Sequence, residues 1–165
     1  MVSPDDDARE ARPPRLSDLV ALCRRLNEEH ARYVVIGGMA IIQAGFVRAT
    51  EGIDLLVDTS PDNISCLRRA LRSLPDRAID ERADSDLDQY VVVRVADEIV
   101  VDLMKAACGI EHGEASRFVD PVDIEGVTIP FASPRLLWRT KQTVRDKDRM
   151  DRAFLASLLP PDELT

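Results

Sequence analysis

The sequence lacks any long uninterrupted hydrophobic segment. Its apolar runs have the length of a single strand, far below the roughly 20 residues that a membrane-spanning helix requires. The opening stretch, MVSPDDDAREARPPR, is acidic and has no apolar centre of the kind found in a secretory signal. These absences predict a protein without a membrane partner, located in the reducing cytoplasm.

Cysteine is scarce, and its spacing excludes two common frameworks. Cys23, Cys66 and Cys108 are far apart, odd in number and without CxxC spacing. Each stands among apolar residues, so we expect small core thiols rather than a disulfide framework or a zinc site. His112 lies in a glycine-flanked loop that has no third convincing metal ligand, and no metal is predicted there.

Positive charge is in deficit, with 22 lysines and arginines against 30 aspartates and glutamates, a net charge of −8. The overall field would therefore repel nucleic acid and acidic lipid. A polyanionic partner must be held by a local basic patch or through a metal ion. The length of 165 residues and the apolar share of 45% are ordinary for one soluble domain.

The pattern divides the chain into three parts. Residues 1–14 are polar and proline-bearing, and they are predicted to be a flexible lead-in. Residues 15–132 are predicted to form the core, and residues 133–165 a helical extension packed on it. Strands and helices alternate in the core without a strict βαβ rhythm, which favours an α+β fold with a mixed sheet flanked by helices.

The elements follow from apolar periodicity, caps and glycine or proline breaks. Helices are expected over residues 15–30, 39–46, 61–74, 133–144 and 146–159, and strands over 33–36, 53–57, 90–95, 99–104, 122–125 and 127–131. The last four strands form two antiparallel hairpins because only short turns separate them. Residues 76–86 are expected outside the core, and residues 106–116 are expected to be irregular or weakly helical.

Two glycines separate the first strand from the helix that follows it. Gly37 and Gly38 allow a sharp turn and leave the amides of a helix start open to an anion such as phosphate. A tight turn without any ligand also explains two glycines.

Two aspartates interrupt apolar strands, Asp54 in IDLLV and Asp102 in VVDLM. A carboxylate in such a strand is unfavourable unless it has a cation, a basic side chain or a shared proton. Magnesium is a suitable cation because it binds carboxylate and phosphate oxygens together. The alternative is a pair of structural carboxylates bonded to an arginine such as Arg48.

Taken together, these motifs resemble a known family. The order GG-x-A (37–40), R-x-T (48–50), IDLLVD (53–58) and VDLM (101–104) is similar to the small nucleotidyltransferase fold of the polymerase-beta-like superfamily, and more closely to bacterial relatives of the AbiEii-type toxins. The similarity extends from about Tyr33 to Leu159. It implies a nucleoside triphosphate (NTP) held with magnesium or manganese, and transfer of its nucleotidyl group to a hydroxyl of RNA, protein or a small molecule. An antitoxin protein is a further implied partner.

Carried onto this chain, the family's glycine pair falls on Gly37 and Gly38. The second acid of its paired-acid strand falls on Asp54, and its third acid falls on Asp102, the expected base for the acceptor hydroxyl. The first acid falls on Gly52, which has no side chain to bind metal. The resemblance therefore supports nucleotide binding better than turnover. A catalytically impaired member that binds nucleotide or protein, such as a toxin–antitoxin component, is the alternative function.

The missing acid leaves Glu51 as a candidate metal ligand. In a regular strand Glu51 points to the face opposite Asp54, and only a bulge or a loose strand end would turn it inward.

Basic groups near the end of the chain complete the candidate site. Lys141 and Arg145 are four residues apart, the spacing of one helical face, so either could meet a phosphate. A salt-bridged, solvated helix face with Asp148 and Asp151 explains the same charges, and the resemblance is what favours Lys141 as a catalytic residue. Arg48 and Thr50, in the loop that leads into the acidic strand, are candidate nucleotide contacts.

Overall fold

A six-stranded mixed sheet forms the centre of the protein, in a computed structural model that describes residues 10–164. The strands lie in the order β3-β4-β2-β1-β8-β7, and β2–β4 and β1–β8 are the parallel pairs. Their bounds are β1 (Tyr33–Ile36), β2 (Gly52–Val57), β3 (Val92–Ala96), β4 (Val100–Met104), β7 (Val119–Ile124) and β8 (Val127–Ala132). This α+β arrangement confirms the predicted fold class.

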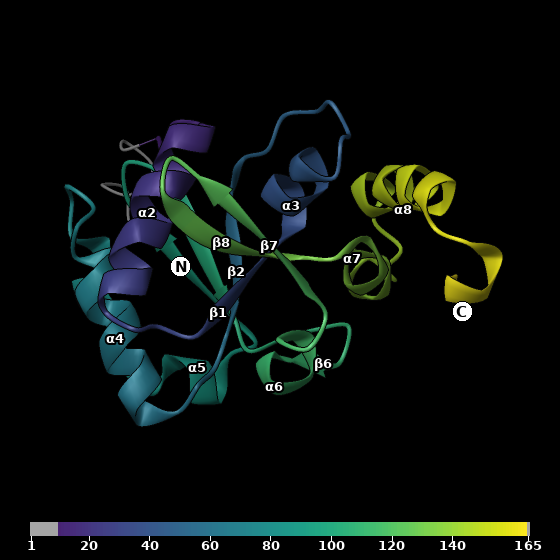
Figure 1. Ribbon diagram of the computed structural model, residues 1–165. Helices are drawn as coiled ribbons and strands as arrows, with labels where there is room; N and C mark the ends of the chain where they lie inside the picture. Colours follow the sequence, from purple (N-terminus) through teal and green to yellow (C-terminus); the bar gives the residue numbers. More distant parts are fainter. Residues whose placement is uncertain (1–9, 165) are drawn as a thin grey trace.

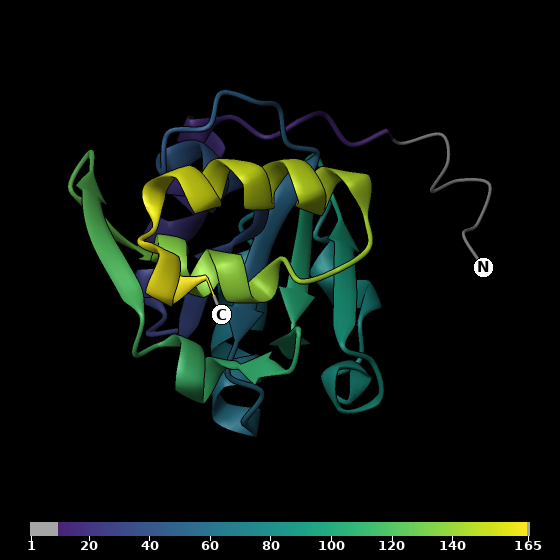
Figure 2. The same ribbon diagram turned by 90° about the vertical axis from the view of Figure 1, so that its right-hand side faces the viewer.

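Helices cover both faces of the sheet (Figure 1). On one side lie α2 (Leu16–Glu28) and α4 (Pro61–Leu71), and on the other lie α3 (Gly37–Gln43), α7 (Pro134–Thr140) and α8 (Asp146–Leu158). Figure 2 looks onto the second side, with α7 and α8 in front of the sheet. Short elements complete the chain: η1 (Ala78–Glu81), α5 (Asp86–Gln89), β5 (Ala106–Ala107), β6 (Ile110–Glu111), α6 (His112–Ala115) and η2 (Pro161–Glu163).

Local sequence explains where the main elements begin. All four residues of β1 are buried, as expected for an apolar strand covered on both faces. Proline stands in the first turn of both α4 and α7, where it suits the fixed backbone angle of a helix start. Ser133 caps α7, because its hydroxyl oxygen accepts a hydrogen bond from the Leu136 amide.

Helix α7 is shorter than predicted. It ends at Thr140 rather than near Val144, and the next residues form a loop that leads into α8. The guanidinium of Arg152 on α8 donates to the carbonyls of Lys141 and Thr143. These carbonyls therefore bond to another helix instead of continuing α7.

Two further expectations were wrong in detail. Ala78 and Ile79 are buried in η1, although residues 76–86 were expected outside the core. The turn is fixed by the buried carboxylate of Asp97, which accepts hydrogen bonds from the amides of Asp76 and Ala78. Residues 106–116, expected to be irregular or weakly helical, contain the short helix α6 and also a two-stranded hairpin that was not expected.

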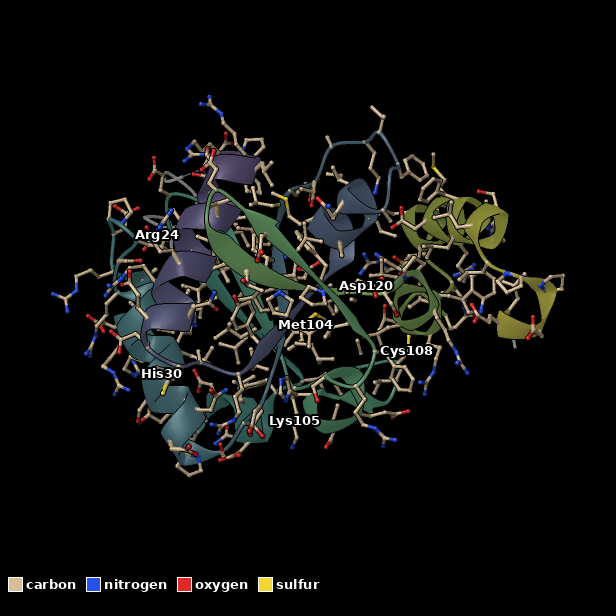
Figure 3. All side chains as sticks on the ribbon, in the orientation of Figure 1. Arg24, His30, Met104, Lys105, Cys108 and Asp120 are labelled. Atoms are coloured by element: carbon tan, nitrogen blue, oxygen red, sulfur yellow. The ribbon has the colours of Figure 1, made fainter. Side chains whose placement is uncertain are left out.

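The cysteines are unpaired, but only one is a core thiol. Cys23 is buried, Cys66 is partly exposed and Cys108 is exposed. Figure 3 places Cys108 beside α7, where its thiol donates to the Thr140 carbonyl at 3.3 Å. The apolar neighbours of Cys108 in the sequence suggested a buried thiol, but Cys108 is exposed and contacts polar backbone near the end of α7.

The two ends of the described chain both lie against the domain. Residues 1–9 of the expected lead-in fall outside the described part. The Arg12 amide donates to the Glu98 carbonyl at 3.0 Å, and the Arg12 guanidinium donates to both carboxylate oxygens of Asp18. Leu136 and Leu137 of α7 belong to the same hydrophobic core as the sheet. No helix within residues 10–164 is long and apolar enough to cross a membrane.

Candidate functional site

A cavity of about 560 Å³ lies over the β3-β4-β2 part of the sheet. This volume is within the range of about 300–1,000 Å³ that is usual for small-molecule sites. Glu10, Ala11 and Pro13 contribute to its wall. Its charged lining residues are Glu10, Glu51, Asp54, Arg94, Asp102, Arg145 and Lys147.

Asp54 and Asp102 meet at the cavity because of the register between their strands. They are direct partners in the parallel pairing of β2 with β4. Paired residues of neighbouring strands project from the same face and lie about 5 Å apart along the hydrogen-bonding direction. The structure therefore brings together the two carboxylates that the sequence singled out.

Asp54 is a half-buried carboxylate without a partner. Among residues 10–164 no side chain or amide makes a hydrogen bond or ion pair with it. Burial, followed by the negative charge of Asp102, raises the pKa of Asp54 to about 6, against the weaker opposing effect of Lys141, Lys147 and Arg145. A proton or a bound cation would relieve this unfavourable charge.

Gly37 makes room for Asp54. A Cβ atom at Gly37 would lie 2.0 Å from Oδ2 of Asp54, and the φ angle of +67° also favours glycine. At Gly38 a Cβ atom would lie 2.3 Å from Oγ1 of Thr50. The glycine pair thus lets the start of α3 approach β2 and the segment before it, and neither glycine lines the cavity.

Asp102 is held by an arginine that the sequence analysis did not select. Nε and Nη2 of Arg94 donate to the two oxygens of Asp102 at 3.0 and 3.1 Å. The two residues are partners in the antiparallel pairing of β3 with β4. The predicted hairpin, with its turn at residues 96–98, contained part of this signal, because it places positions 94 and 102 on the same face of neighbouring strands; the observed register makes them direct partners.

Arg48 and Lys141 lie outside the cavity lining and bind carboxylates of α8. Arg48 donates to Asp151 at 3.0 Å, and Nζ of Lys141 lies 3.0 Å from Asp151 and 3.2 Å from Asp148. Two other predicted phosphate contacts, Thr50 and Arg145, do line the cavity. Lys147 joins them as a lining cation.

The carboxylates suit one cation better than two. Within the described residues, no three His, Cys, Asp or Glu side chains lie close enough together to hold a metal ion. Gly52 supplies no donor, and a Cβ atom there would lie 3.0 Å from the Val100 carbonyl oxygen. Glu51 precedes β2 and lines the cavity with an exposed side chain. Asp54 and Asp102 could thus share one magnesium ion with phosphate oxygens, once Asp102 is released by Arg94.

Comparison with known proteins gives the fold. The chain is similar to the crystal structure of a Thermotoga maritima protein provisionally named a nucleotidyltransferase, with a TM-score of 0.52 and 17% identity over 87% of this chain and 90% of that chain. This chain has the nucleotidyltransferase fold. No family model and no curated protein sequence matches it. The nucleotidyltransferase fold is therefore confirmed, while the relationship to AbiEii-type toxins stays a prediction.

Proposed function

We propose that this protein is a magnesium-dependent nucleotidyltransferase that moves a nucleoside monophosphate group from an NTP to a hydroxyl acceptor. The observation that carries this proposal is Asp54, an unpartnered carboxylate that lines a cavity beside Asp102 and lies within the field of lining cations. A half-buried charge without a protein partner is typical of a ligand site.

The cavity offers groups for each part of an NTP and its metal. Arg145 and Lys147 would neutralise phosphate oxygens, Arg145 with two bonds and Lys147 as a point charge. Asp54 and Asp102 would hold magnesium, which supplies charge neutralisation and orientation of the phosphates when bound. The acceptor oxygen would bond to the α-phosphorus as the bond to pyrophosphate breaks, and the hydroxyl proton would pass to Asp102.

A second candidate follows from Gly52. With no acid at this position, a pair of metal ions lacks a shared ligand, so the attacking and leaving oxygens would be clamped less firmly. The protein would then bind nucleotide or another protein without efficient turnover, for example as a toxin–antitoxin component of the AbiEii type. Binding and transfer measured separately distinguish the two functions.

The first experiment is calorimetric titration with ATP, CTP, GTP and UTP, with and without magnesium or manganese. We expect at least one NTP to bind, and the metal to strengthen binding in the wild type but not in Asp54→Asn. Asp88→Asn is the control, because Asp88 is an exposed aspartate outside the cavity. Absence of binding by all four nucleotides would contradict the transferase and the nucleotide-binding member, and it would leave a protein-binding role.

The second experiment tests transfer. Labelled NTP is incubated with the protein and with cellular RNA, a protein extract or small hydroxyl compounds including aminoglycoside antibiotics. Label that appears in one acceptor class and is lost in Asp54→Asn identifies a nucleotidyltransferase and its acceptor. Nucleotide binding without any transfer would favour the impaired member.

A further inference from the structure

Arg94 and Asp102 form a closed pair inside the cavity. The guanidinium makes two hydrogen bonds to the carboxylate, at 3.0 and 3.1 Å, and the strand register sets the two residues opposite each other. A carboxylate has about four positions for donors or cations, and a bidentate guanidinium takes two of them and adds a positive charge. In this arrangement Asp102 is a poor ligand for a metal ion.

The two partners differ in their freedom to move. The Arg94 side chain is 66% exposed, whereas that of Asp102 is 13% exposed. Arg94 also stands on β3, at the edge of the sheet, while β4 lies between two strands. An ion pair with one exposed partner contributes only about 1 kcal/mol or less. Arg94 can therefore leave at small cost, and Asp102 stays in place.

The cavity offers Arg94 a second partner when an NTP is bound. Arg94 lines the same cavity as Arg145 and Lys147, and Thr50 lies in the same lining. A guanidinium binds phosphate oxygens with the same two-pronged geometry that it uses for a carboxylate. A triphosphate carries several negative charges, and it therefore competes well with a single carboxylate.

We propose that Arg94 exchanges partners, holding Asp102 in the nucleotide-free protein and moving to the phosphates of a bound NTP. This inference rests on the proposed nucleotide site and assigns Arg94 as a phosphate-binding residue that also controls Asp102. The exchange frees Asp102 for the cation only after the nucleotide has arrived. Without nucleotide, a metal ion finds only Asp54 free, because Arg94 still binds Asp102, and the metal ion therefore binds weakly.

Arg94→Gln tests the exchange because it changes two affinities in opposite directions. Manganese alone, followed by its electron paramagnetic resonance signal, should bind about fivefold more tightly, since Asp102 loses its competing cation. The NTP that binds the wild type, titrated in EDTA so that no metal is present, should bind about tenfold more weakly, since one charged phosphate contact is lost. The NTP affinity of Arg94→Lys should lie between those of the wild type and Arg94→Gln, because lysine keeps the positive charge and loses the bidentate geometry of the guanidinium.

Arg72→Gln is the matched control. Arg72 pairs with Asp80 at 2.7 Å on the surface, and it does not line the cavity. It removes the same charge from another arginine–aspartate pair, so it should change neither affinity. Thermal unfolding of every variant checks that the fold is kept.

The outcomes separate this inference from the proposed function. If the wild type binds no NTP, the nucleotide site itself is wrong. If the wild type binds an NTP and Arg94→Gln binds it equally well, Arg94 is no phosphate ligand and the exchange is refuted, whatever happens to manganese. Weaker NTP binding without tighter manganese binding also refutes it, because Asp102 would then not have been blocked.

Discussion

Two clusters of this molecule combine a pair of aspartates with basic side chains, and they differ in completeness. The helix cluster consists of Arg48, Lys141, Asp148 and Asp151, whose side chains are between 0% and 13% exposed. Each carboxylate there contacts at least one cation. The cavity cluster consists of Asp54, Arg94, Asp102, Arg145 and Lys147, and within the described part of the chain Asp54 has no hydrogen-bond or ion-pair partner.

The difference separates a structural role from a binding role. Each charge of the helix cluster lies within 3.2 Å of an opposite charge, although Nε of Arg48 and Oδ1 of Asp151 make no hydrogen bond. The helix cluster can therefore fix α8 to the segment before β2 without any ligand. The cavity cluster leaves one carboxylate unneutralised beside open space, which is unfavourable unless a ligand sometimes fills it. Each of the following changes tests that contrast, from the largest expected change in stability to the smallest.

Removing a carboxylate from the helix cluster should have the largest effect. Asp151→Ala leaves Lys141 and Arg48 with one carboxylate fewer in a buried setting, and the free energy of unfolding should fall by about 3–5 kcal/mol. Urea denaturation measures the change. Asp146→Ala on the same helix removes a side chain that is 95% exposed, and it should change stability by less than about 0.5 kcal/mol. Equal effects of the two variants would contradict a structural role for the cluster.

Closing the space beside Asp54 should be nearly as severe. Gly37→Ala sets a methyl group 2.0 Å from the Asp54 carboxylate oxygen at a φ angle of +67°, so we expect a loss of about 2–4 kcal/mol and no nucleotide binding. At Gly113 an added methyl would meet nothing within 4 Å, and Gly113→Ala should be neutral or slightly stabilising. A stable Gly37→Ala protein with normal nucleotide binding would contradict the tight packing inferred at this turn.

The sequence predicts the cavity carboxylates well and the cations poorly. Asp54 and Asp102 stand out because each interrupts an apolar strand, and the glycine pair marks a close approach of backbone to side chain. The resemblance favoured Lys141, and its partners Asp148 and Asp151 are those of the alternative salt-bridged face. Arg48 was selected for its place before the acidic strand, but its partner Asp151 lies 103 positions along the chain. Local periodicity carries no information about such pairs.

Arg94 illustrates the reverse case. Its strand and a turn after it were predicted, but the predicted turn sets Arg94 opposite Val100, whereas the observed register sets it opposite Asp102. The residue was missed because an exposed arginine on an edge strand has a common structural explanation, shielding the edge from other chains. Arg94 would have been found only by considering every residue on the same face of the neighbouring strand within two positions of Asp102's predicted partner.

Neutralising Asp54 should stabilise the protein while abolishing its metal site. Because burial and Asp102 raise the pKa of Asp54 to about 6, the folded state binds more protons than the unfolded chain between about pH 4 and pH 6. Stability is therefore lost as the pH rises through that window. The free energy of unfolding of Asp54→Asn should exceed that of the wild type by about 1–2 kcal/mol at pH 7, a value reduced for solvent screening in the cavity. Below pH 4 the two proteins should be equally stable.

Unfolding of Asp54→Asn and wild type across pH 4–7, in EDTA, measures this difference. Asp88→Asn, at an exposed site outside the cavity, should show the same pH dependence as the wild type. A destabilised Asp54→Asn at pH 7 would mean that Asp54 has a partner that stabilises its charge.

Restoring the acid at position 52 should have the smallest effect on stability and the clearest effect on binding. Gly52 lines the cavity, and a Cβ atom there would lie 3.0 Å from the Val100 carbonyl oxygen, so Gly52→Asp should cost about 1 kcal/mol. Because the new carboxylate would stand two residues from Asp54 on the same face of β2, it should strengthen manganese binding with nucleotide by about tenfold. Gly52→Asn is the isosteric control, and it should not strengthen manganese binding. If transfer of label also rises, the cavity cluster is a working site that lacks one ligand, whereas tighter metal binding without transfer would assign the protein to the binding members of its fold.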